Sequence, residues 1–310
     1  MKGLLVPVFL LILLPSVYGQ GCSDAGFCTM GAMKPDQPFS RRLNIRLRSM
    51  ELSYYRGKTT MTPVVHSLTA DLNFTLNTRN GLQVKLPFQW VNGRLGDTKG
   101  AGDISLCYTR LVWNGDVWNL SASMGAKLPT NRSDKTSAEG LPLPMYYQTS
   151  LGTYDGIAGL SLISRKWMFA TGLQVPFNQN GNQFLWGKWA SRPDVSDYIL
   201  GYGRAKDLRR GVDVMFRAER NFRFSRFNAS IGLLPIWRIR RDEFTSPQGV
   251  RVTANGTTGM ALSAIGTLGY QFNVKSGFRL LYGKKIHQRD LNLDGLTRES
   301  VVTFSYIYKF

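Results

Sequence analysis

The sequence predicts an all-β fold, a transmembrane antiparallel β-barrel of about 12 strands with short periplasmic turns and long extracellular loops. Three observations predict it. Apolar and polar residues alternate through a dozen segments, short and long connections follow one another in turn, and no apolar run after residue 15 is long enough for a membrane-spanning helix. A tilted strand crosses a bilayer in about 9–11 residues, as these segments do. Closure into a barrel leaves no unpaired backbone edge in lipid.

The alternation is clearest at residues 301–310, VVTFSYIYKF. Val302, Phe304, Tyr306, Tyr308 and Phe310 share one face, and mostly polar residues occupy the other. Successive side chains of a strand point to opposite faces, so one face of this segment is apolar and aromatic. The same alternation predicts strands at residues 41–55, 64–76, 82–90, 102–113, 117–128, 157–164, 166–177, 209–220, 227–240, 260–272, 278–286 and 301–310.

The connections and the tryptophans favour a membrane barrel over a soluble β-sandwich. Short turns are expected near residues 79, 115, 165, 222 and 275, and mostly longer polar loops near residues 58, 97, 138, 193, 248 and 293. An even strand count places both ends of the barrel on the short-turn, periplasmic side. Tryptophans near strand ends fit the aromatic girdle of a membrane interface, whereas a sandwich would scatter them through its core: Trp90, Trp113, Trp118, Trp167 and Trp237.

The first 40 residues indicate export. Residues 1–20 read as a signal peptide, because a short positive start precedes the apolar run 4–14 and small residues follow near the expected cleavage site. Residues 21–40 are expected to form a periplasmic N-terminal segment, in which Cys22 and Cys28 are candidates for a small disulfide loop. This segment either remains a periplasmic stub or enters the bore as a plug. Residues 41–310 form the barrel, and the predicted location is the outer membrane of a Gram-negative bacterium.

The net charge of +19 bears on the partners. In a soluble protein such a charge suggests nucleic acid, but export argues against that partner. We expect instead outer-membrane lipid, lipopolysaccharide and a small-molecule solute. The outer-membrane assembly machinery is a further expected partner, because Tyr306, Tyr308 and the terminal Phe310 resemble the C-terminal signal that it reads.

With the apolar face outside, the polar face lines the lumen. Basic side chains outnumber acids on that face, so an open lumen would favour anions. The basic residues predicted to line the lumen are Arg46, Arg48, Lys85, Arg217, Arg238, Arg240 and Arg279. The alternative is that these residues and the acids Asp71, Asp213 and Glu219 cross-link into a network that blocks the bore.

The segment 178–208 is unusually aromatic for an extracellular loop. Phe184, Trp186, Trp189 and Tyr198 are candidates for a gate or for an apolar ligand site over the mouth. The alternatives are a loop that packs on itself and a contact with lipopolysaccharide acyl chains.

The sequence offers no catalytic site, and we predict no enzyme activity, metal or cofactor. Of the two histidines, His66 falls on the apolar face of its strand with Ser67 on the opposite face. His287 lies beside a loop that contains Asp290 and Asp294, an arrangement that any solvated loop can show. Neither a supported nucleophile nor metal-ligand spacing is present.

An ordered series of motifs resembles the MetA-pathway phenol-degradation group of outer-membrane transporters, which are distantly similar to long-chain fatty-acid transporters. The series is GAGDISL (100–106), GAKLPT (125–130) and LGTYDGIAGLSL (151–162), within a matching stretch of about residues 82–177. The residues that match the pattern are Gly102, Asp103, Lys127, Leu128, Pro129, Gly152 and Asp155. The resemblance implies passage of small molecules, with hydrophobic ones as candidates, and it supplies no catalytic residues.

The predicted function is therefore passive passage of small molecules across the outer membrane. Two routes stay open: anionic solutes through a basic lumen, or hydrophobic compounds by way of the aromatic loop. The main alternative is a structural or surface-binding barrel with a blocked lumen. A barrel hydrolase that uses His66 or His287 is the least favoured hypothesis.

Overall fold

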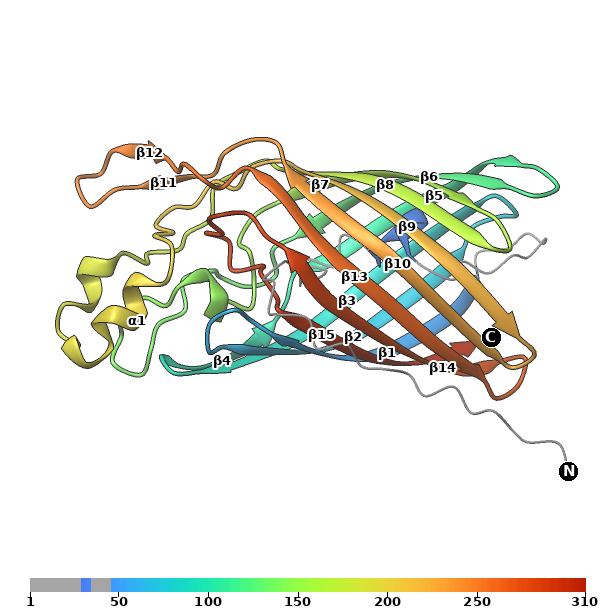
Figure 1. Ribbon diagram of the computed structural model, residues 1–310, viewed down its shortest axis with the longest axis horizontal. Helices are drawn as coiled ribbons and strands as arrows, with labels where there is room; N and C mark the ends of the chain where they lie inside the picture. The colour runs from blue at the N-terminus through green and yellow to red at the C-terminus, as the bar shows by residue number, and fades with distance from the viewer. Residues whose placement is uncertain (1–28, 35–45) are drawn as a thin grey trace, which may run out of the picture.

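A computed structural model of the chain describes residues 29–34 and 46–310, and the signal peptide, Cys22 and Cys28 lie outside these ranges. Twelve strands form the wall of a barrel, and a short strand, β4, extends one of them (Figure 1). The strands of the wall are β1 (Arg46–Lys58), β2 (Val64–Thr75), β3 (Asn80–Gly93), β4 (Gly96–Ala101), β5 (Ile104–Asn114), β6 (Asn119–Leu128), β7 (Asp155–Ile163), β8 (Trp167–Pro176), β9 (Asp213–Phe224), β10 (Phe227–Arg238), β13 (Gly259–Gln271), β14 (Ser276–His287) and β15 (Ser300–Lys309).

Each strand pairs antiparallel with its neighbours along the chain, and β1 pairs with β15 to close the ring. β4 and β5 together act as one broken strand. β3 pairs with β5 along Asn80–Lys85 and with β4 along Phe88–Gly93. Pro87, which has no N–H to donate, lies where β3 changes partner. The predicted fold class, a closed antiparallel barrel of 12 strands, is confirmed.

The two faces of the wall differ as the alternation predicted. Large apolar side chains such as Leu68, Phe88 and Phe304 are exposed on the outside, where lipid would contact them. Polar side chains such as Glu51 and Asp71 are buried on the inside. This is the arrangement that a hydrocarbon surrounding requires.

The two ends of the barrel also differ. One end, called the short-turn end below, carries the turns 76–79, 115–118, 164–166, 225–226 and 272–275 together with the C-terminus. The turn expected near residue 222 lies at Ser225, whose φ of 46° is left-handed, because β9 runs on to Phe224. In the described ranges no helix is long and apolar enough to cross a membrane.

The opposite end, called the loop end, carries the long connections 129–154, 177–212, 239–258 and 288–299. They contain η3 (Met145–Tyr147), η4 (Trp186–Trp189), η5 (Pro193–Val195), α1 (Ser196–Leu200) and the hairpin β11 (Glu243–Thr245) with β12 (Arg251–Thr253). Figure 1 shows these elements gathered beyond one end of the barrel, with the β11–β12 hairpin projecting away from it.

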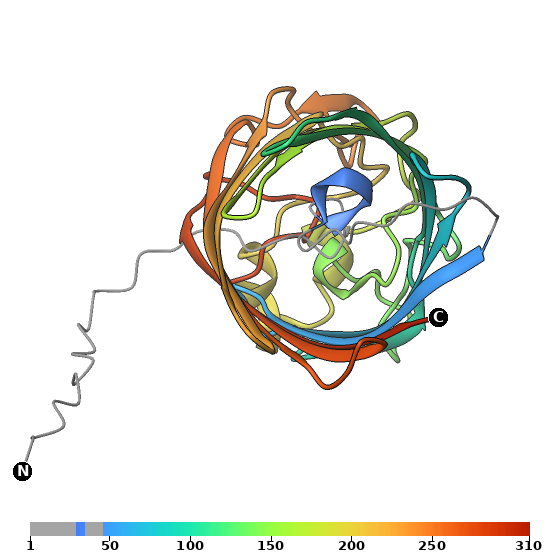
Figure 2. The same ribbon diagram turned by 90° about the vertical axis from the view of Figure 1, so that its right-hand side faces the viewer.

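Residues 29–34, which include η2 (Gly31–Met33), lie inside the bore, and we call them the plug segment. Figure 2 looks into the barrel from the short-turn end and shows this blue turn surrounded by the ring of strands. Of the two positions that the sequence left open for the N-terminal segment, these six residues take the one within the bore.

Candidate permeation pathway

The bore begins at the short-turn end with a cavity of about 1050 Å³, which we call the vestibule. Eight basic and two acidic side chains line it, so its wall is strongly cationic. The basic residues are Lys34, Arg48, Arg79, Arg165, Arg223, Arg226, Arg279 and Lys309, and the acidic residues are Glu51 and Asp116. A concave site lined by one sign of charge concentrates ions of the opposite sign.

Several vestibule arginines lie in turns, which the face-by-face sequence analysis did not consider. Arg79, Arg165 and Arg226 come from three different short turns of the same end. Strand alternation cannot assign a turn residue to a face, so those positions were missed. The recurrence of arginine in three of the five short turns is the signal that would have found them.

The plug segment ends the vestibule, and polar contacts hold it to one side of the bore. Lys34 Nζ lies 2.8 Å from Glu51 Oε2 and 2.7 Å from Asp71 Oδ2. The backbone N–H of Gly31 donates to Gln83 Oε1 at 2.7 Å, and Lys85 Nζ donates to Thr29 Oγ1 at 2.7 Å. These partners come from β1, β2 and β3, so three adjacent strands fix the segment by charge and hydrogen bonds.

The other side of the plug segment is apolar. Met30 and Met33 are fully buried and form one cluster with inward-facing apolar side chains of the wall. The wall residues of this cluster are Cys107, Ile157, Ala170, Met215, Leu234, Ile236 and Ile265. Fully burying a methionine side chain contributes about 1.5–3 kcal/mol, so these two residues help to hold the segment in the bore alongside its polar contacts.

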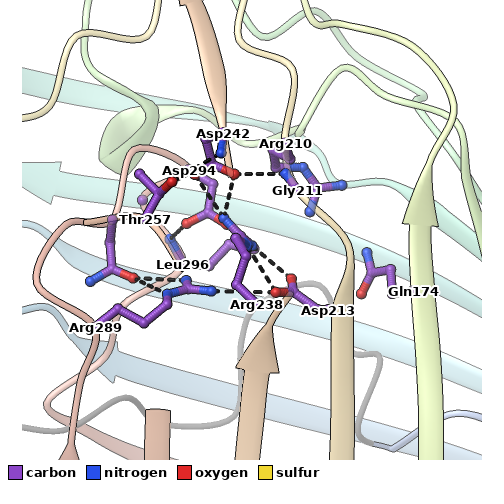
Figure 3. Close-up of polar contacts among 12 residues, drawn as sticks. Gln174, Arg210, Gly211, Asp213, Arg238, Asp242, Thr257, Arg289, Asp294 and Leu296 are labelled. Atoms are coloured by element: carbon purple, nitrogen blue, oxygen red, sulfur yellow. Dashed lines mark hydrogen bonds and ion pairs between the residues drawn. The ribbon is translucent and has the colours of Figure 1, made fainter. Parts of the chain in front are cut away.

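Beyond the plug segment, a buried ionic network occupies the loop end of the bore (Figure 3). Arg238, at the end of β10, contacts three carboxylates: Asp213 at 2.6 Å, Asp242 at 2.9 Å and Asp294 at 2.7 Å. Arg289 lies 3.3 Å from Asp213. The five side chains come from β9, β10 and the loops 239–258 and 288–299, so the network ties two loops to the wall.

Asp294 illustrates the electrostatics of this network. Burial alone would raise its pKa, but Arg238, Arg289 and Arg210 together hold the pKa of this carboxyl below its ordinary value. The carboxylate is therefore charged at neutral pH and fully engaged. With two arginines and three aspartates, this network offers no excess of positive charge that would attract anions.

The residues of the resemblance motif extend this network. Lys127 Nζ lies 3.6 Å from Asp103 Oδ2, and Asp155 forms an ion pair with Arg210, all four side chains being buried. Gly152 has a φ of 68°, a left-handed conformation that favours glycine. Asp103 also accepts hydrogen bonds from the Leu151 N–H, at 3.0 Å, and from the Ser150 hydroxyl, so this motif residue ties the loop 129–154 to the wall, a structural role that the sequence alone did not assign.

The basic residues that were predicted to line the lumen do not all lie in the same environment. Lys85, Arg217 and Arg238 face inward and are paired with acids: Lys85 lies 3.9 Å from Asp71, and Arg217 forms an ion pair with Glu219. Arg279 reaches Glu51 at 3.5 Å and lines the vestibule. The sequence alternative of cross-linked charges therefore describes much of the bore.

Two expected lumen residues, Arg46 and Arg240, are exposed and do not line the vestibule. Arg240 follows the end of β10 and is exposed beside Glu243, because the strand ends before it reaches that position. Arg46 is exposed and does not line the vestibule, whereas Arg48 does. The pairing of β1 with β2 shifts between Leu47 and Ser49, so Arg48 lies at a bulge, while Arg46 pairs with Thr75 of the vestibule wall at the start of the strand.

The aromatic loop forms a packed core rather than an open surface. Phe184 and Trp189 are buried in a cluster with Tyr202 of the same loop and with Leu143 and Tyr147 of the loop 129–154. Tyr198 packs against the same cluster, whereas Trp186 is partly exposed beneath the guanidinium of Arg204. The self-packed alternative describes this loop, which covers the mouth of the barrel (Figure 2).

The remaining sequence candidates are also placed. His66 lies on the outer face, where its ring stacks on Trp90 and its Nδ1 lies 2.7 Å from Tyr54 Oη, while Ser67 is buried on the inner face. Tyr306 and Phe310 are exposed outward along β15, with the Tyr308 ring packed edge-on against Phe310. Within the described ranges no group of three or more His, Cys, Asp or Glu side chains is arranged to hold a metal.

Comparisons with known proteins bear on the fold. No protein-family model and no curated protein matches the sequence. The chain is similar in structure to a COG4313 outer membrane channel from Pseudomonas putida F1, with a TM-score of 0.56 and 16% identity over 89% of this chain and 100% of that one. The KdgM porin (TM-score 0.43, 8% identity, 84% of this chain and 99% of that one) and the NanC porin (0.45, 10%, 85% and 98%) resemble it less well.

At these identities the first comparison shows that the chain has the barrel fold of that channel. The resemblance to the MetA-pathway phenol-degradation group stays a prediction, because no family model supports it.

Proposed function

We propose that this protein is an outer-membrane channel for small anionic solutes, and that its bore is closed in the conformation described above. The observation that carries the proposal is the vestibule, in which eight basic side chains face two acidic ones. The barrel fold shared with an outer membrane channel supports the channel role and the location. The signal peptide read from residues 1–20 supports export, with the long loops outside the cell.

A hydrophobic route by way of the aromatic loop is less well supported, because Phe184 and Trp189 are buried in a packed cluster. A second candidate function, a structural barrel with a blocked lumen, is favoured by the plug segment and by the ionic network around Arg238.

Selectivity of single channels in a planar bilayer tests the proposal. Under a salt gradient, current steps of the wild-type protein should reverse at a potential of anion sign. Replacing Arg165, Arg223 and Arg226 together by Gln should lower the anion-to-cation permeability ratio several-fold, because three vestibule charges are lost.

The matched control replaces three exposed basic residues of the loop end, Lys188, Arg240 and Arg241, by Gln and should leave the ratio unchanged. Equal selectivity of the two triple variants would contradict the anion proposal. An absence of steps from protein shown to be folded would contradict the channel itself and support the blocked barrel.

A further inference from the structure

One sector of the outer surface, at the loop end of the barrel, carries a band of basic and aromatic side chains. The strand registers place six outward-facing residues in one row across β4, β3, β2, β1, β15 and β14: Lys99, Trp90, His66, Arg56, Val302 and Tyr282. The His66 and Trp90 rings stack with centroids 5.3 Å apart and an interplanar angle of 4°. Such aromatic rings mark the membrane interface on barrel walls.

The next outward-facing row, closer to the loops, adds two lysines. Lys58 and Lys284 lie in this row on either side of Ser300, and both are about half exposed. Both approach the same carboxylate, Glu299, at 3.9 Å and 3.8 Å. Asp97 lies in this row as well. The two rows together contain four basic residues, Arg56, Lys58, Lys99 and Lys284, beside two acidic ones, Asp97 and Glu299. The sector therefore keeps an excess of positive charge.

The row on the opposite side of the aromatic band, toward the middle of the barrel, is apolar. It contains Phe88, Leu68, Tyr54, Phe304 and Leu280, in register across β3, β2, β1, β15 and β14. Polarity thus changes over three successive rows, from basic residues through aromatic rings to an apolar surface. The order of these rows, basic, then aromatic, then apolar, matches an amphiphile with an anionic head group and acyl chains.

An outward-facing row on the opposite wall carries no basic residue. A register row across β6, β7, β8, β9, β10 and β13 presents Met124, Ala158, Leu173, Val214, Trp237 and Met260 to the outside. None of these residues is charged. The basic band is therefore a local feature of one sector and not a property of the whole rim.

We propose that the sector formed by Arg56, Lys58, Lys99 and Lys284 binds lipopolysaccharide, the phosphorylated glycolipid of the outer leaflet, through its phosphate groups. Charge-assisted hydrogen bonds from guanidinium and ammonium groups would hold the phosphates, and the apolar rows below would contact the acyl chains. The apolar rows favour this lipid over a free anion, which would gain nothing from them. This site is independent of the proposed channel activity.

Native mass spectrometry of the folded protein in detergent, titrated with diphosphoryl lipid A, tests the site. Wild-type protein should retain lipid A, and the Arg56→Gln, Lys58→Gln, Lys284→Gln variant should bind it at least about tenfold more weakly, since each such contact is strong. The Lys188→Gln, Arg240→Gln, Arg241→Gln variant, with the same loss of charge outside the sector, should bind as the wild type does. Heat-modifiable migration on gels establishes that each variant is folded.

Two further arms identify the chemistry. Lipid A from which both phosphates have been removed should bind wild-type protein as weakly as diphosphoryl lipid A binds the sector variant. Inorganic pyrophosphate should not displace lipid A at comparable concentration. Equal binding of lipid A by the two triple variants, or by wild type with and without the lipid's phosphates, would overturn the proposal. Displacement by pyrophosphate would show a free-anion site instead of a lipid site.

Discussion

Replacing Gly31 by valine is expected to make Cys107 react with a polar maleimide that the wild-type protein excludes. Cys107 is buried beneath the plug segment, whose Gly31 lines the vestibule. A Cβ at position 31 would overlap Cys107 Sγ and lie 2.6 Å from Ser123 Oγ, and the φ of 51° is unfavourable for a branched residue. The segment therefore has to leave its place, and the thiol becomes accessible.

The size of the effect follows from the burial of Met30 and Met33. Losing two fully buried methionine side chains removes about 3–6 kcal/mol of docking free energy, which is roughly a 10²- to 10⁴-fold shift toward the displaced form. The labelling rate should rise by a corresponding factor. The measurement is mass-spectrometric maleimide labelling of folded protein in which Cys22 and Cys28 have been replaced by Ser.

The control is Gly187→Val in the same background, because a side chain at that position would meet open space. A labelling rate of Gly31→Val no higher than that of this control would show that the plug segment does not protect the bore. Faster labelling would also show that the vestibule admits a solute as far as the middle of the barrel.

Replacing Arg238 by methionine should release the loops 239–258 and 288–299 from the wall. Three carboxylates, Asp213, Asp242 and Asp294, would lose their shared partner while they remain buried. Breaking a buried ion pair in this way costs about 3–5 kcal/mol, which raises local opening of the loops roughly 100-fold or more. Limited proteolysis of folded protein should show faster cleavage within these loops while the barrel stays intact.

The effect should depend on pH in a defined direction. In the wild type the pKa of Asp294 is held low, so this group contributes stability at neutral pH that is lost as the pH falls. Without Arg238, fewer positive charges counteract the effect of burial on Asp294, and the pKa of this carboxyl rises. The unpaired carboxyl then protonates more readily, and the substitution should destabilise the loops less at pH 4 than at pH 8.

Arg240→Met is the matched control, since Arg240 lies two residues further on, is exposed and approaches Glu243 at 3.9 Å. Its cleavage rate should equal that of the wild type. A cleavage rate of Arg238→Met that is also unchanged, or that does not vary with pH, would mean that packing and not charge holds the loops.

The strands were predictable because a barrel wall in lipid imposes strict alternation. Phe304 and Leu68 had to face outward and Asp71 inward, whatever the rest of the chain does. Bulges and strand ends were less predictable, because they carry no sequence signal. The bulge at Arg48 and the early end of β10 before Arg240 are set by strand pairing, not by residue type.

The contents of the bore could not be derived in the same way. Lys34 meets Asp71, and Asp294 meets Arg238, across large separations in sequence that no local pattern encodes. The aromatic loop was recognised as unusual, but its packing depends on partners such as Leu143 from another loop. Sequence patterns thus predicted the wall, whereas the plug segment and the ionic network around Arg238 depend on tertiary contacts.

The β11–β12 hairpin has a practical consequence. Its tip projects away from the barrel, Val250 is exposed there, and a side chain at Gly249 would meet no other atom within 4 Å (Figure 1). Residues 246–250 therefore tolerate additional sequence, as exposed loop tips generally do. With the long loops outside the cell, as proposed above, a peptide epitope inserted after Gln248 should be recognised by antibody on intact bacteria, which would make this hairpin a carrier for displaying foreign peptides at the cell surface.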